Sequence, residues 1–342
     1  MVLFRIQPIL NSLVFGAVLS ISSAHAVTPM KISVDTVPSH VRNVWIEKFI
    51  TRVKEKTGGE IEPQLFHSGQ LYKDAQVPAA LQQGAIDMAV PGTWLLGGLE
   101  KRMGVPGLPY FIGRSAEENY RFSDGPVGRE LADIAAEKMN TIVLGRWIDN
   151  GHSFIFLGAK GADKVKTYKD FSGLKIRYPG GANLSIRFTQ MGATPVLVPL
   201  PDVPLALMRG NFDGLISTAD SMVALKLWES GLKAAYIDYG SFAQQVPFVN
   251  KNFWSKLSPV HQKAVREAWE SIVVEQRRDS TQREEASLST LAKNGVKLVR
   301  PGAVELKAFR DSQLAVQDEI VSQMGLDSAW VKSFIAAVDS AK

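Results

Sequence analysis

Apolar and polar residues along the chain follow strand and helix periods in turn. Residues 30–35 and residues 61–66 alternate between apolar and polar, and each stretch predicts a half-buried strand. Between them, apolar side chains recur every three or four residues from Trp45 to Val53, which predicts a helix ending at Gly58-Gly59. A strand–helix–strand opening is typical of an α/β domain.

Two segments of the chain resemble each other. Residues 77–87 read VPAALQQGAID and residues 203–213 read VPLALMRGNFD, with Val, Pro, Ala, Leu, Gly and Asp at matching places. Each predicts a short helix with Pro near its start, ending at Gly and leading into a strand. Chance similarity between two such units is the alternative, but we favour two α/β lobes built alike, with a ligand cleft between them.

Further elements follow the same reading. Strands are predicted at 141–147, 153–157 and 174–178, and helices at 182–191, 219–229, 303–324 and 327–338. Ser115 and Glu118 have the spacing of a capping box. Apolar residues at helical spacing predict one helix over 258–294, which would extend roughly 55 Å at 1.5 Å per residue and span both lobes.

The expected fold class is therefore α/β, with two lobes, a ligand cleft between them and a long spine helix. The expected divisions are a signal peptide (1–26), lobe I (27–150 plus about 244–257), lobe II (151–243), the spine helix (258–294) and a C-terminal strand and helices packing on the lobes (295–342).

The N-terminus predicts export. Arg5 precedes an apolar run, and Ala24-His25-Ala26 has the small residues of a cleavage site. We expect cleavage after Ala26 and a periplasmic mature protein. A retained anchor is the alternative, disfavoured because the apolar run is short for a membrane span.

Composition excludes several kinds of chemistry. The chain has no cysteine, which excludes thiol catalysis, thiolate metal sites and iron–sulfur clusters. Without Arg5, 38 Lys and Arg face 34 Asp and Glu. This slight excess is dispersed along the chain and predicts no nucleic-acid partner. No nucleophile elbow, HExxH, phosphate-binding or dinucleotide-binding motif is present. We therefore expect a binding protein rather than an enzyme, with no cofactor and no metal.

One segment carries a family resemblance. Residues 169–179, KDFSGLKIRYP, resemble the L-x-G-L-K-I-R-x-P segment of the periplasmic solute-binding subunits of TRAP transporters, the dicarboxylate-binding DctP type. Five more segments resemble the family in the same order: HSGQL (67–71), LQQGAID (81–87), LPYF (108–111), FDG (212–214) and FVNKNFWSKL (248–257). The resemblance implies a two-lobed periplasmic binding protein fold, capture of a small organic acid anion and its delivery to TRAP membrane permease subunits.

The resemblance implies that Arg177 pairs with a carboxylate of the ligand. Guanidinium offers two parallel donors that match a carboxylate, which lysine cannot provide. The alternative is a surface arginine, or one paired to a neighbouring acid.

The sequence departs from the family at two positions. Ser153 stands where many members have a second arginine, and Ser217 where many have asparagine. We therefore expect a ligand with one strongly held carboxylate and a smaller polar or more apolar remainder. Asn150 and His152, two residues apart, are also candidates for the cleft. His152 could substitute as a donor, although a strand-edge histidine facing solvent is equally consistent with the pattern.

Four more residues are candidates for the cleft. Gln245 matches a cleft-lining amide of some members, although strand register leaves Gln244 open. Trp94 and Trp147 are candidates for flat apolar walls, with core packing as the alternative for each. Asp35 falls where relatives place a polar contact, and it would repel an anion unless it met a hydroxyl or amine.

Several questions stay open at this stage. A binding protein that presents its ligand to a membrane sensor is an alternative function, and an exported α/β hydrolase is a weaker one. Dicarboxylates, keto acids, sugar acids, aromatic acids and amino acids all remain candidate ligands. We expect a monomer.

Overall fold

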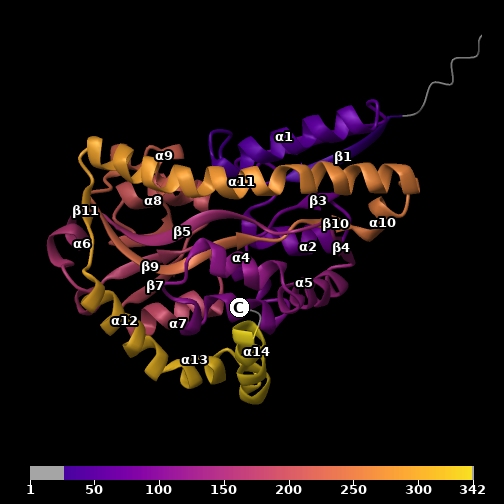
Figure 1. Ribbon diagram of the computed structural model, residues 1–342. Coiled ribbons are helices and arrows are strands. Elements are labelled where there is room, and N and C mark those ends of the chain that lie inside the picture. The colour runs from indigo at the N-terminus through magenta and orange to yellow at the C-terminus, as the bar shows by residue number, and fades with distance from the viewer. Residues whose placement is uncertain (1–26, 341–342) are drawn as a thin grey trace, which may run out of the picture.

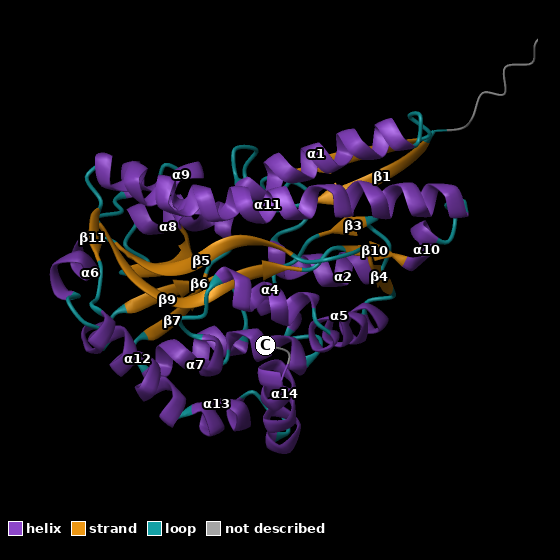
Figure 2. Ribbon diagram, viewed as in Figure 1, coloured by secondary structure: helices purple, strands orange, loops and turns teal. Residues whose placement is uncertain are grey.

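The computed structural model describes residues 27–340, which form two mixed β-sheets surrounded by helices (Figures 1 and 2). The predicted signal peptide lies outside the described residues. No helix within residues 27–340 has both the length and the apolar character needed to cross a membrane.

The first sheet has five strands in the order β2-β1-β3-β10-β4. Parallel pairing joins the first three, and β10 runs antiparallel to both of its neighbours. The strands are β1 (Thr28–Ser33), β2 (Ile61–Phe66), β3 (Met88–Ala89), β4 (Thr141–Val143) and β10 (Phe248–Asn250).

The second sheet has six strands in the order β11-β9-β5-β8-β6-β7. The strands are β5 (Ile148–Leu157), β6 (Lys175–Tyr178), β7 (Thr194–Leu197), β8 (Gly214–Thr218), β9 (Ala234–Gln245) and β11 (Lys297–Val299). The chain leaves the first sheet after Val143 and joins the second at Ile148, and it returns between Gln245 and Phe248. Two neighbouring short crossings therefore connect the sheets, and the chain passes between them a third time over residues 251–296, from β10 to β11.

Helices cover the faces of both sheets (Figure 2). Their bounds are α1 (Val41–Lys56), α2 (Val77–Gln82), α3 (Thr93–Leu96), α4 (Ala116–Asp124), α5 (Pro126–Lys138), α6 (Ala159–Lys164), α7 (Ala182–Gln190), α8 (Val203–Met208), α9 (Ala219–Ala224), α10 (Lys251–Trp254), α11 (Pro259–Lys293), α12 (Ala303–Ala315), α13 (Gln317–Gln323) and α14 (Ser328–Ser340). Consecutive strand residues point into different apolar clusters, as Phe154 and Ile155 do, so the second sheet has a core on each face.

The internal similarity corresponds to a structural repeat. Helices α2 and α8 both have Pro in the first turn, and each is followed by a glycine with positive φ, 70° at Gly84 and 69° at Gly210. The aspartates that follow also act alike. Asp87 Oδ2 accepts from the Lys31 backbone N–H at 2.7 Å, and Asp213 Oδ2 accepts from the Lys175 N–H at 2.8 Å. The same helix–glycine–strand unit therefore occurs once beside each sheet.

The long helix α11 confirms the predicted spine. It contacts α1 beside the first sheet and both α9 and β5 beside the second, and it extends along the whole molecule in Figure 1. Gln276 bonds both backbone groups of Asp149, donating to the carbonyl at 2.6 Å and accepting from the N–H at 3.3 Å. The helix therefore fixes the chain where β5 begins.

Some predicted element bounds were wrong. The strand predicted at 141–147 ends at Val143, and the one predicted at 153–157 begins at Ile148. The helix predicted at 219–229 ends at Ala224, because Lys226 takes a left-handed conformation with φ 48°. The helix predicted at 303–324 is two helices that meet at Val316. The capping box of Ser115 and Glu118 is confirmed, with both of its hydrogen bonds formed.

Candidate ligand-binding site

A cavity of about 770 Å³, part of it open to solvent, lies between the two sheets. Residues that follow β1 and residues in and after α3 line it from the first sheet, and residues of β5, β6, β8 and β9 line it from the second. Seven of the nine residues proposed from the sequence line this cavity: Asp35, Trp94, Asn150, Ser153, Arg177, Ser217 and Gln245.

Arg177 is held rigidly at the cavity wall. Its side chain comes from β6, and the residue is 1% exposed. Nε donates to the carbonyl of Val198 at 2.8 Å, and Nη1 donates to the carbonyl of Ile216 at 3.3 Å. Nη2 is buried and has no hydrogen-bond partner. Burial lowers the pKa of Arg177 to about 10, against the opposing charges of Asp35 and Asp74, so the group is cationic at neutral pH.

Arg177 differs from the other buried arginines in residues 27–340. Four of the five form ion pairs with acids: Arg42 with Asp35, Arg114 with Asp339, Arg187 with Asp238 and Arg277 with Asp124. Arg177 forms none with a described residue. A buried charge without a partner is costly, because it has lost water and gained no counter-charge. An anion in the cavity would supply that counter-charge.

The register of β9 distinguishes the two glutamines. Gln245 lines the cavity, is 0% exposed, and has no partner for either its amide nitrogen or its amide oxygen. Gln244 points the other way and donates to the carbonyl of Asn119 at 3.3 Å. Gln245 is therefore the glutamine that can meet a ligand, with one donor and one acceptor.

Trp94 forms part of the cavity wall, and its buried indole Nε1 also has no partner. The start of α7 approaches it closely. Gly181 has φ 91°, and a Cβ at this position would lie 2.5 Å from the Trp94 carbonyl oxygen. The absence of a side chain at Gly181, after β6, thus allows the start of α7 to pack against the backbone of Trp94.

The polar residues on β5 and β8 are small. Ser153 and Ser217 both line the cavity, with Ser153 paired to Thr218 across the two strands. Asn150 lies at the same wall, and its buried side-chain oxygen has no partner. No second arginine takes the place of the missing one on β5, because the cavity's only other arginine, Arg42, is committed to Asp35 within the part of the chain described here.

The structure places His152 away from the cavity. Its Nδ1 is 3.1 Å from Glu284 on α11, and its Nε2 is 3.0 Å from the carbonyl of Arg114. Both contacts are satisfied at once only when both nitrogens carry protons. Burial alone would lower the pKa of His152, but the hydrogen bond and charge of Glu284 outweigh it and raise the pKa. Adjacent strand residues point to opposite faces, so Ser153 lines the cavity and His152 does not.

The structure also places Trp147 outside the cavity. The residue is 2% exposed and packs edge-on against Phe122 in the apolar core beside the first sheet, at 5.8 Å between ring centroids. It precedes β5, where the chain crosses between sheets. The core-packing alternative considered for both tryptophans therefore describes Trp147, while Trp94 lies at the cavity.

Sequence reasoning missed two charged residues at the cavity. Arg42, on the first turn of α1, forms an ion pair with Asp35 and also donates to Thr36 Oγ1 at 3.1 Å. Asp74 begins the short 3-10 turn η1 (Asp74–Gln76), is 9% exposed and faces the cavity. It lies three residues after the HSGQL segment, a family feature that gives no signal of its own for a ligand contact at Asp74.

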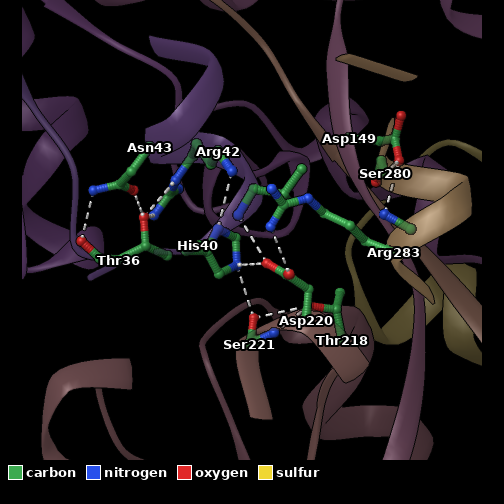
Figure 3. Close-up of polar contacts among 12 residues, drawn as sticks. Thr36, His40, Arg42, Asn43, Asp149, Thr218, Asp220, Ser221, Ser280 and Arg283 are labelled. Atoms are coloured by element: carbon green, nitrogen blue, oxygen red, sulfur yellow. Dashed lines mark hydrogen bonds and ion pairs between the residues drawn. The ribbon is translucent and has the colours of Figure 1, made fainter. Parts of the chain in front are cut away.

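Hydrogen bonds next to the cavity join the start of α1, beside the first sheet, to α9, beside the second (Figure 3). Burial, followed by the charge of Arg42, lowers the pKa of His40 to about 3, so its ring is neutral. Nδ1 accepts from the Arg42 backbone N–H at 3.1 Å, and Nε2 therefore donates to Ser221 Oγ on α9 at 2.9 Å. Asp220 on α9 accepts from the Val41 N–H at the start of α1 at 2.8 Å, and it lies 3.5 Å from Arg283 of the spine helix.

Comparison with known proteins identifies the family. Residues 36–324 match the family of bacterial extracellular solute-binding proteins, family 7, also called DctP. The chain belongs to this family. The predicted resemblance to TRAP solute-binding subunits is confirmed, and so is the α/β two-lobed fold with a cleft between lobes and a spine helix.

Individual relatives cover most of the chain. A solute-binding protein of Chromohalobacter salexigens is 28% identical over 291 residues, which are 84% of this chain and 82% of that protein. A TRAP periplasmic solute-binding protein of Sulfurospirillum deleyianum, solved with bound succinate, aligns with a TM-score of 0.83 at 22% identity, over 93% of this chain and 100% of that one. The sugar-acid-binding protein DctPAm of Advenella mimigardefordensis, solved with galactonate, has a TM-score of 0.84 at 20% identity, over 93% and 99%.

The unpaired charge of Arg177 predicts an unusual effect on stability. Replacing Arg177 by Met should raise the free energy of unfolding of the ligand-free protein by roughly 1–3 kcal/mol, because a buried charge without a partner is removed. The matched control is Arg187→Met, which strands the buried Asp238, 2.5 Å away, and should lower the free energy by roughly 3–5 kcal/mol. Chemical denaturation measures both, and equal losses in the two variants would mean that Arg177 has a purely structural role.

The His152–Glu284 pair predicts a pH dependence of stability. The folded protein holds the pKa of His152 above its ordinary value of 6.5, so the pair stabilises fully below pH 6.5 and loses this contribution as pH rises through the folded value. The free energy of unfolding of His152→Gln should fall below that of wild type by roughly 1.5–3 kcal/mol at acidic pH, with a smaller gap at alkaline pH. Denaturation curves at several pH values measure this gap. A gap that keeps the same pH dependence in a Glu284→Gln background would contradict the pairing.

Proposed function

We propose that this chain captures a small organic acid anion in the cavity, with Arg177 binding a carboxylate of the ligand, and delivers it to the membrane permease subunits of a TRAP-type transporter. The observation that carries the proposal is the guanidinium of Arg177. It belongs to a residue that lines the cavity, it is buried and cationic, it has no ion-pair partner among residues 27–340, and its Nη2 has no hydrogen-bond partner. Two backbone carbonyls hold the group in one orientation, so little entropy is lost when a ligand binds it.

The ligands of related proteins support an acid. Both solved relatives described above hold carboxylates, succinate in one and galactonate in the other. These two molecules differ in length, hydroxylation and charge, and share only the carboxylate. Proteins that bind such different acids would share one carboxylate-binding group and differ in the other residues of the cavity.

The energetics of capture are consistent with this arrangement. Micromolar affinity requires about 8 kcal/mol. Losing a charge-assisted contact of the Arg177 type costs roughly 2–5 kcal/mol. Burial of the remainder of the ligand between Trp94 and the second sheet, with hydrogen bonds to Gln245 and Asn150, would supply the rest.

Capture is expected to involve closure of the two lobes. The crossings near residues 144–147 and 246–247 would act as hinges, because hinge motions concentrate in a few residues between rigid elements. The contacts of His40 with Ser221 and of Asp220 with Val41 would form on closure and break on opening. The closed form would then be the one that the permease recognises.

The mature protein is expected to begin at Val27 and to work in the periplasm as a monomer, without chemical change to the ligand. The family itself is extracytoplasmic, which agrees with the secretory pattern of residues 1–26. Turnover of a bound acid by the purified protein would contradict this part of the proposal.

Arg177→Lys tests the carboxylate contact. Lysine keeps the charge but cannot bond both backbone carbonyls and the ligand, so the affinity for organic acids should fall roughly 30- to 1,000-fold, which is about 2–4 kcal/mol. Isothermal titration of the mature protein with the acids that shift its thermal unfolding measures the change. The control is Arg209→Lys, which alters an exposed arginine at the end of α8 and should leave binding unchanged. A folded Arg177→Lys protein that binds as tightly as wild type would remove Arg177 from the site.

A further inference from the structure

Asp74 is the acidic counterpart of Arg177 in the same cavity. Of the buried acids in residues 27–340, Asp35, Glu100, Asp149, Asp220 and Asp238 all accept hydrogen bonds from neighbouring groups or form ion pairs. The carboxyl group of Asp74 has neither with any described residue, although the residue is only 9% exposed. Its side chain instead faces the cavity.

The charged groups around Asp74 do not neutralise it. Asp35 lies on the segment after β1 and repels it, while Arg42 on α1 and Arg177 on β6 attract it without reaching ion-pair distance. His40, the remaining titratable group at the cavity, is neutral. Burial raises the pKa of Asp74 to about 7, and Asp35 adds to the effect against Arg42 and Arg177. The ionised carboxylate, which predominates above pH 7, would be stabilised by a ligand group that donates a hydrogen bond to it.

Other residues that line the cavity have unpartnered polar atoms of both kinds, hydrogen-bond donors and acceptors. Free donors are Arg177 Nη2, Trp94 Nε1 and Gln245 Nε2, and free acceptors are Gln245 Oε1 and Asn150 Oδ1. A ligand composed only of carboxylates offers acceptors alone, so it would satisfy the donors and leave the acceptors and Asp74 without partners. Each buried acceptor left without a partner costs roughly 1–3 kcal/mol.

We infer that the ligand is a monocarboxylate with a hydroxyl or amino group away from its carboxylate, and that Asp74 accepts a hydrogen bond from that group. The inference rests on the proposed function, because it places the ligand carboxylate at Arg177. It also limits the class of acid that the cavity would bind. A second carboxylate would meet Asp74 as a like charge, and an unsubstituted acid would leave Asp74 without a donor.

Matched acids test this class directly. The four-carbon probes are butyrate, 4-hydroxybutyrate, 4-aminobutyrate and succinate, and the six-carbon probes are hexanoate, 6-hydroxyhexanoate, 6-aminohexanoate and adipate. Each series changes only the group at the far end of the molecule. Titrated into the mature protein at pH 8, the hydroxy or the amino member of at least one series should bind at least 10-fold more tightly than its unsubstituted and dicarboxylate counterparts.

Asp74→Asn shows which donor the site takes and whether Asp74 causes the preference. If the donor is an ammonium group, the loss of charge should weaken binding at least 10-fold. If it is a hydroxyl group, Asn keeps an acceptor and the loss should be under about 3-fold, while Asp74→Ala should lose at least 10-fold. In either case Asp74→Asn should bind the dicarboxylate more tightly than wild type does, a gain that misfolding cannot produce. The control is Asp163→Asn, which changes an exposed acid on α6.

The possible failures are distinguishable. If succinate, adipate or an unsubstituted acid binds wild type as tightly as its hydroxy and amino counterparts, and Arg177→Lys weakens that binding, this inference is overturned and the proposed function stands. It is also overturned if Asp74→Asn and Asp74→Ala leave the preference among the acids unchanged. If none of the acids binds at millimolar concentration, or if Arg177→Lys does not affect binding, the proposed function and the inference fail together.

Discussion

A positive charge buried without a counter-charge is the feature around which the cavity is arranged. The guanidinium of Arg177 has left water and is bonded to two carbonyl oxygens, yet no carboxylate among the described residues lies within ion-pair distance. Folding alone does not favour such a state. An anion in the cavity would make it favourable. In the proposed function, relief of this cost on binding adds to the affinity for the ligand.

The fold supplies the rigidity that this arrangement needs. Helix α11 packs on elements beside both sheets, and Gln276 holds the start of β5, the strand that carries Asn150 and Ser153. Next to the cavity, neutral His40 and ionisable Asp220 connect α1 to α9 by direct hydrogen bonds. The groups that line the cavity therefore come from elements beside two separate sheets. In the proposed function, a ligand that contacts both sides would stabilise their association, and binding and closure would be linked in this way.

Much of the fold could be predicted from the sequence, because the residues that form each helix, turn and strand show the pattern typical of that element. The repeat of α2 and α8 was visible because the same proline, glycine and aspartate serve the same geometry twice. The spine helix was visible as an unbroken helical period. Arg177 stood out through its family segment, but its lack of an ion-pair partner could be seen only in three dimensions. Likewise, the orientations of Gln244 and Gln245 depend on strand register, which a single sequence does not fix.

There are physical reasons why the sequence did not place some of the residues at or near the cavity. His152 precedes Ser153 on a strand, so only one of the two could face the cavity, and the partner of His152 is Glu284, far along the chain. Trp147 has a flat apolar side chain that would suit a cavity wall, but it packs in the apolar core beside the first sheet. Asp35 forms an ion pair with Arg42, whereas Asp74 forms none with a described residue. This difference depends on how the chain folds and cannot be seen in the sequence.

The measurement that tests the account most directly is a crystal structure of the mature protein with the acid that most stabilises it. The account predicts a carboxylate oxygen of that acid within hydrogen-bond distance of Arg177 Nη2, in the cavity between the sheets. A ligand whose carboxylate is held elsewhere, with Arg177 Nη2 still unpartnered or bonded to the protein alone, would contradict it.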